Sequence, residues 1–329
     1  MPVEPAAPAA APAAPAAPDH RLLHIDRRVV YLFLLVALTT PLVAQKFTNK
    51  LTMKPAPLPS ARKLFDRIEQ IAKERDEAAK AGQPWNKIVV LGSEVEPQTR
   101  GELYPQAEAV IRHLMMRRLK FAVMTLTPAG VGYCNAIPSK VERELGRAYG
   151  KDWANFGYQV GGSLRLQQMG KNIPGTLKAD VRGDSLTDPK VVQDKLPCMA
   201  GIKDAGDVAL VVEISGLVGT LGSWINYFAS EKSRPDMANG CTAVSVTDSF
   251  AYLESKQIVG LLEGIAGAAA YNEFLNEIRE PDQPYPSDGP RKHMTSQTVA
   301  HVLVILFVAL GNAGVLLALL ARRRKGAGS

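Results

Sequence analysis

The chain has 329 residues, of which 46% are hydrophobic and 22% are charged, and its net charge is +7. This balance is typical of a folded protein rather than a disordered one, and the charge is too small to predict a nucleic-acid-binding surface. Cys134, Cys198 and Cys241 lack the CxxC or Cys/His spacing of a zinc site. We interpret them as buried structural thiols and expect no metal site.

An apolar stretch near the N-terminus, residues 29–45, follows Arg27 and Arg28 and contains Pro41. Two interpretations remain open, an uncleaved signal-anchor helix and a cleaved signal peptide. The long Ala/Pro-rich leader before it, residues 1–28, favours the anchor. The leader has the composition of an extended polyproline tail, which cannot bury a core.

The second apolar stretch, residues 298–321, is long enough to cross a bilayer as a helix, and a basic tail, residues 322–329, follows it. Asn312 lies between Gly311 and Gly314. Small residues in a membrane helix indicate a packing face, for self-association or for a membrane-protein partner. A plain anchor with tolerated small residues is the alternative.

Basic residues beside both stretches favour cytoplasmic tails, because lysine and arginine that flank a membrane span prefer that side. We therefore expect a two-pass protein of the inner membrane, with the intervening domain outside the cytoplasm. Lys46, Lys50 and Lys54 follow the first stretch and weaken this signal. An odd number of cysteines also argues against an oxidising compartment.

Between the two stretches the sequence predicts a linker (residues 46–59), a folded domain (residues 60–280) and a proline-rich stem (residues 281–297). Ser60 is expected to cap a charged helix that ends near Ala81. The narrow apolar stripe of this helix favours packing on the domain over binding of a partner.

Short apolar runs then alternate with helical patterns, which indicates parallel strands joined by helices. We predict a three-layer α/β domain, Rossmann- or flavodoxin-like, with a mainly parallel sheet and a transmembrane helix on each side of it in the sequence. The predicted strands are residues 87–91, 120–126, 153–160, 207–215 and 241–246. The predicted helices include residues 104–119, 139–149, 163–169 and 260–278, one that ends near 231, and one that begins at 249.

Ligands of such folds bind beyond the carboxyl ends of the strands, and the loops there carry candidate residues. After the first strand, Glu94 and Glu96 could share acid/base work or bind a cation, and Arg100 could hold an anion. The alternative is a surface loop in which Arg100 pairs with one of these glutamates.

A glycine loop with Gly216, Gly219 and Thr220 follows the fourth strand. The order of strand, loop and helix N-terminus suits an anion. Its spacing matches no nucleotide-binding fingerprint, however, and close packing explains the glycines better. Asp248 follows the fifth strand, where we expect it to cap the next helix.

A serine or cysteine hydrolase is not favoured by the residues present. Only His113 and His293 lie between the apolar stretches, and the chain has no GxSxG motif. Cys241 is predicted at the start of a strand, away from the edge where a nucleophile would act. No cofactor is predicted by any motif.

Three segments, residues 105–115, 149–158 and 240–244, resemble a family of uncharacterised bacterial membrane-associated α/β proteins. The likeness covers residues 89–271, which is nearly all of the predicted domain. It implies family membership and bacterial membrane association, and it transfers no activity, cofactor or catalytic residue.

Two functions from different classes fit this sequence. The first is a non-enzymatic accessory or scaffold subunit of a cell-envelope complex, because two anchors surround one domain that lacks a nucleophile constellation and a complete phosphate loop. The second is a ligand-binding or hydrolytic domain that uses Glu94, Glu96, Arg100 and the glycine loop. The sequence favours the first.

Overall fold

The structure is a computed structural model that describes residues 27–45, 47, 52–217, 219–231 and 233–326. The described residues divide into two compact units, one that lies within residues 1–41 and 296–329 and the other within residues 42–295. The expected Ala/Pro-rich tail lies outside the described residues, apart from Arg27 and Arg28.

Two apolar helices supply the first unit, α1 (Arg27–Ala44) and the greater part of α11 (Gly289–Gly326). Among the described helices only α11, over Gly289–Leu316, is long and apolar enough to cross a membrane by length and composition. The apolar part of α1 is shorter and has Pro41 inside it, so the second predicted span is not confirmed.

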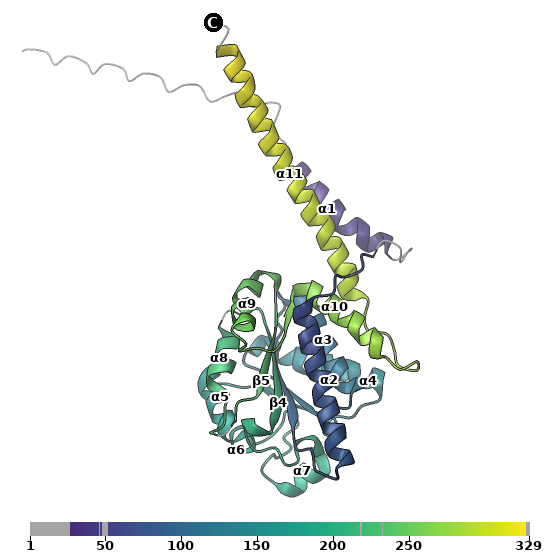
Figure 1. The fold of residues 1–329 in the computed structure, drawn as a ribbon, viewed down its shortest axis with the longest axis vertical. Coiled ribbons are helices and arrows are strands. Elements are labelled where there is room, and N and C mark those ends of the chain that lie inside the picture. The colour runs from purple at the N-terminus through teal and green to yellow at the C-terminus, as the bar shows by residue number, and fades with distance from the viewer. Residues whose placement is uncertain (1–26, 46, 48–51, 218, 232, 327–329) are drawn as a thin grey trace, which may run out of the picture. The chain divides into compact units, whose positions relative to one another are not determined.

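The second unit is built on one six-stranded sheet in which every neighbouring pair of strands is parallel (Figure 1). The strand order is β3-β2-β1-β4-β5-β6, which confirms the predicted α/β class. The strands are β1 (Ile88–Glu94), β2 (Phe121–Thr125), β3 (Trp153–Tyr158), β4 (Val208–Ser215), β5 (Asp236–Cys241) and β6 (Leu261–Glu263).

Helices cover both faces of this sheet. One face packs against α2 (Pro59–Lys80), α3 (Arg100–Met116), α4 (Val131–Leu145) and α10 (Gly264–Ile278). The other face packs against α5 (Gly162–Lys171), α6 (Ile173–Leu177), α8 (Thr220–Tyr227) and neighbouring segments, which include α7 (Pro189–Lys195) and α9 (Val246–Glu254).

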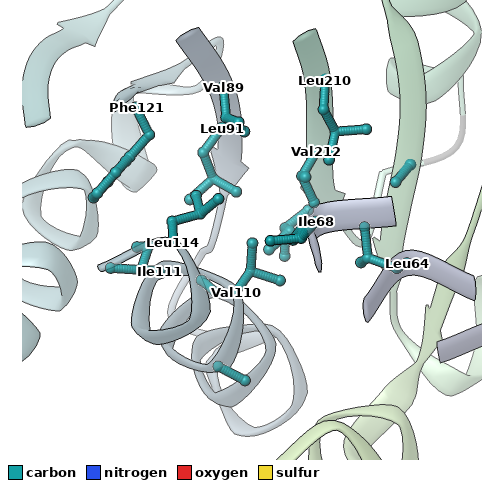
Figure 2. Packing of buried hydrophobic residues seen from close by; sticks show 14 of the residues in the cluster. Leu64, Ile68, Val89, Leu91, Val110, Ile111, Leu114, Phe121, Leu210 and Val212 are labelled. Carbon is teal, nitrogen blue, oxygen red and sulfur yellow. The ribbon is translucent and has the colours of Figure 1, made fainter. Parts of the chain in front are cut away.

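Alternating strand residues divide the core into two layers, because successive side chains of a strand point to opposite faces. Figure 2 shows the first layer, where Leu91 of β1 and Val212 of β4 point toward Ile68 of α2 and the apolar side of α3. Val90 and Val211 belong to the opposite layer. Glu94 lies an even number of residues after Val90 on β1, and Glu213 lies an even number after Val211 on β4. Both glutamates therefore face the second layer.

The sequence predicted the presence of the helices better than the residues at which they begin. The helix expected from residue 139 is α4, which begins eight residues earlier and has Pro138 inside it. The proline lacks one helical N–H, but burial of Cys134, Ile137 and Val141 on one face offsets that loss. Ser60 is not an N-cap, because Leu58 takes that position and the Ser60 hydroxyl donates to Glu263.

The fifth strand was predicted in the wrong place. Residues 241–246 were expected to form it, but β5 ends at Cys241, and Ala243–Ser245 is a short 3-10 turn. Strand propensity favours the β-branched run after Cys241, yet pairing decides the outcome, since β5 lies between β4 and β6 and bonds to both. The three-residue β6 was not predicted.

Candidate functional site

The carboxyl edge of the sheet contains the point where the chain changes faces. The connection after β1 leads to α3 on one face, whereas the connection after the adjacent β4 leads to α8 on the other. Open α/β sheets bind ligands beside such a point. A pocket lies here on the α8 and α9 side.

This pocket, which we call the β4–β5 pocket, has a volume of about 400 Å³. Its wall comes from the ends of β4 and β5, from the loop before α8 and the first turn of that helix, and from most of the length of α9. The wall comprises Glu213, Ser215, Leu217, Gly219, Leu221, Gly222, Asn239, Cys241, Ser245, Thr247, Asp248, Ser249, Ala251 and Tyr252.

Glu213 lines this pocket as its most buried acid, with 1% of its surface exposed. Its Oε2 accepts a hydrogen bond from Asn239 Nδ2 at 2.5 Å, but its Oε1 is buried and has no partner among the described residues. Burial raises the pKa of Glu213 well above its usual value, and the nearby charge of Glu94 adds to the rise. Both effects favour the neutral form of the carboxyl.

Asn239 fixes the orientation of the Glu213 carboxyl. The Asn239 amide donates to the backbone oxygen of Glu213 at 2.9 Å as well as to its side chain, and Ser249 Oγ donates to Asn239 Oδ1 at 2.8 Å. These bonds determine which end of the amide faces the acid. The acid is thus held by β5 and α9 while one oxygen stays available.

The remaining polar wall of the pocket is rich in hydroxyls. Ser215, Ser245, Thr247 and Ser249 contribute hydroxyl groups, and Asp248 contributes a second carboxylate. Among the described residues of this wall there is no lysine, arginine or histidine. The pocket therefore suits a ligand that donates hydrogen bonds better than it suits a phosphate.

Cys241 was predicted at the start of a strand but is the last residue of β5 and lines the pocket. Burial raises the pKa of its thiol to about 12, so the reactive thiolate is not formed at neutral pH. Ser249 is engaged with Asn239, and no histidine belongs to the described wall. The geometry does not support nucleophilic catalysis.

The three charged candidates after β1 do not form one site. Glu94 accepts hydrogen bonds from Thr125 Oγ1 at 2.7 Å and from the backbone N–H of Leu126, and so ties the end of β1 to that of β2. Burial raises the pKa of Glu94, although these bonds oppose the rise. Glu96 accepts from Gln98.

Arg100 lies over the ring of Tyr104, 5.6 Å from its centroid, on the first turn of α3. Neither Glu94 nor Glu96 forms an ion pair with it in the described contacts, so the alternative of a self-paired loop is not what the chain adopts. Arg100 instead lines a separate cavity on the other face of the sheet.

The glycine loop contributes one of its candidates to the pocket. Gly219 lines it and, at φ 91°, precedes α8 in the left-handed conformation that glycine favours. Thr220 is the first residue of α8 and is not part of the wall. A Cβ on Gly216 would lie 2.9 Å from a methyl of Thr99, so close packing explains that glycine.

Asp248 lies in the pocket wall but does not cap α9. The helix begins at Val246 after Ser245, which places Asp248 inside the first turn. Sequence reasoning did not select Glu213 or Asn239 as site residues. A lone acid inside the apolar run of β4 was the available signal for Glu213, whereas the misplaced fifth strand concealed Asn239.

The part of the chain that the structure describes holds no group of three or more His, Cys, Asp or Glu side chains arranged to bind a metal ion. Comparisons with protein-family models, with curated proteins and with solved structures found no match to this chain.

Proposed function

We propose that this protein is a membrane-anchored α/β domain that binds a small molecule carrying a protonated amine in the β4–β5 pocket. The observation that carries the proposal is the unpartnered Oε1 of the buried Glu213. A cation beside it would favour the ionised acid, so binding would release a proton. Asp248 provides a second acceptor in the same wall.

The strand order supports a ligand at this edge. It corresponds to the Rossmann order 3-2-1-4-5-6 rather than to the flavodoxin-like order 2-1-3-4-5. A dinucleotide is not supported, because the loop after β1 lacks the glycine fingerprint. The scaffold role in a cell-envelope complex and self-association through α11 stay predictions that no described contact favours.

The proposal is tested with the full chain in detergent by thermal unfolding against cationic amines, neutral polyols and carboxylates. We expect amines to stabilise the native chain by about 2.7 kcal/mol at about a hundredfold excess over Kd, and to have no effect on Glu213→Gln. Glu96→Gln is the matched control, since Glu96 lies outside the pocket. Equal stabilisation of Glu213→Gln, or a response to carboxylates alone, would contradict the proposal.

We also propose that both apolar helices are anchors and that the sheet-containing unit lies outside the cytoplasm, supported by the length of α11 and by the basic residues beside each stretch. Cys134, Cys198 and Cys241 are all buried, so a cysteine at the exposed Ser287 is a clean reporter. We expect Ser287→Cys to react with a membrane-impermeant maleimide in intact spheroplasts. Reaction only after lysis would place the unit inside.

A further inference from the structure

A second cavity lies on the opposite face of the sheet, and its wall is basic. Its volume is about 430 Å³, and it is lined by α3, by Lys140 of α4 and by the first residues of α11, including Gly289 and His293. We call it the α3–α11 cavity. Every residue of its wall belongs to the sheet-containing unit.

Arg112 is the buried cation of this cavity, with 2% of its surface exposed. Its Nη2 donates to Glu144 and lies 3.4 Å from Glu108 Oε1. Its Nη1 is buried and has no partner among the described residues. A guanidinium that offers one nitrogen in this way is matched by a carboxylate or phosphate oxygen.

Two further cations complete the wall. Lys140 Nζ lies 2.9 Å from both oxygens of Glu108, which neutralises the single carboxylate of the lining. Arg100 is exposed and rests over Tyr104 without an ion pair in the described contacts. The lining thus carries Arg100, Arg112 and Lys140 against Glu108, and Glu144 beside the lining pairs with Arg112, so one positive charge remains in excess.

We propose that the α3–α11 cavity binds a phosphate-ester anion, held by the free Nη1 of Arg112 and by Arg100. Two sources have this chemistry, a soluble phosphate and the headgroup of an anionic phospholipid. The wall includes the N-terminal end of α11, which favours anions, and the apolar part of the same helix begins only a few residues after His293. This site is independent of the amine pocket.

The decisive variant is Arg112→Lys, which keeps the charge beside Glu108 and Glu144 but removes the second nitrogen. The full chain in detergent is titrated with inorganic phosphate by calorimetry. In parallel, the chain in nanodiscs of equal phosphatidylglycerol and phosphatidylcholine is examined for retained lipid by native mass spectrometry. We expect Arg112→Lys to weaken whichever binding the native chain shows by about tenfold.

Arg100→Gln keeps the proposal falsifiable if Arg112→Lys does not fold, because Arg100 is exposed, and we expect it to weaken binding as well. Lys151→Gln, an exposed charge outside the cavity, is the control and should change nothing. Selective retention of phosphatidylglycerol would identify the lipid headgroup as the ligand. Binding of phosphate without lipid selectivity would identify the soluble anion as the ligand. No binding in either arm, or unchanged binding by both variants, would overturn the proposal and leave the amine test unaffected.

Discussion

His113 on one face of the sheet and Glu213 on the other are both buried titratable groups, and their surroundings differ. On the α2, α3 and α10 side, His113 is fully buried and stacks on Phe65. Its Nε2–H donates to Glu69 at 2.7 Å, and its Nδ1 accepts from the Tyr271 hydroxyl at 2.7 Å. Arg117 donates to both Glu69 oxygens. Each of these polar groups has a partner.

On the α8 and α9 side, Glu213 keeps one buried oxygen without a partner. The pKa values of the two glutamates, Glu69 and Glu213, shift in opposite directions as a result. Burial raises the pKa of Glu69, but hydrogen bonds from His113 and Arg117 outweigh it and lower the pKa to about 2. Burial dominates at Glu213 and raises its pKa. A satisfied buried cluster supports the fold, whereas an unsatisfied acid that lines a pocket is available to a ligand.

The largest effect is expected from breaking the satisfied cluster. Glu69→Ala leaves His113 Nε2–H and Arg117 without their acceptor, so we expect the free energy of unfolding to fall by about 2 kcal/mol at pH 7. The pKa of Glu69 is depressed, so its contribution is present above the unfolded value of 4.5 and is lost as the pH falls toward 2. Denaturant unfolding of the full chain in detergent measures both.

Glu77→Ala is the matched control for that change, because Glu77 is an exposed acid of the same helix that pairs with Lys73 at 3.8 Å. Such surface pairs contribute less than about 1 kcal/mol. A Glu69→Ala variant as stable as the control would mean that the cluster does not support the fold in the way its contacts indicate.

Much of the fold follows from sequence pattern alone. Runs such as Val208–Ser215 are apolar on both faces, as a doubly covered parallel strand requires, and four strands lie where they were predicted. β5 was misplaced because its segment contains Asn239 and Gly240, which disfavour strands locally. Pairing with β4 and β6 outweighs that preference, and strand pairing is not visible in a single stretch of sequence.

The candidate site was harder to predict because its residues meet only through the sheet. Glu213 and Asn239 lie opposite each other in the register of β4 and β5, although they are 26 residues apart in the chain. Glu94 and Arg100 are near in sequence, which suggested one site. The structure separates them, since Glu94 points toward the end of β2 while Arg100 opens α3 and lines the α3–α11 cavity.

The most direct test of the account is the pH dependence of stability for Glu213→Gln against the native chain. Because the pKa of Glu213 is raised in the folded state, the unfolded chain loses this proton first, near pH 4.5. The contribution of Glu213 to the free energy of unfolding is therefore fully present below that pH. It declines as the pH rises further, until the pH reaches the pKa of Glu213 in the folded state. We predict that Glu213→Gln lacks this decline, so its relative stability rises with pH. Parallel curves over the whole range would contradict a raised pKa of the buried, partly unsatisfied Glu213 and, with it, the proposed ligand site.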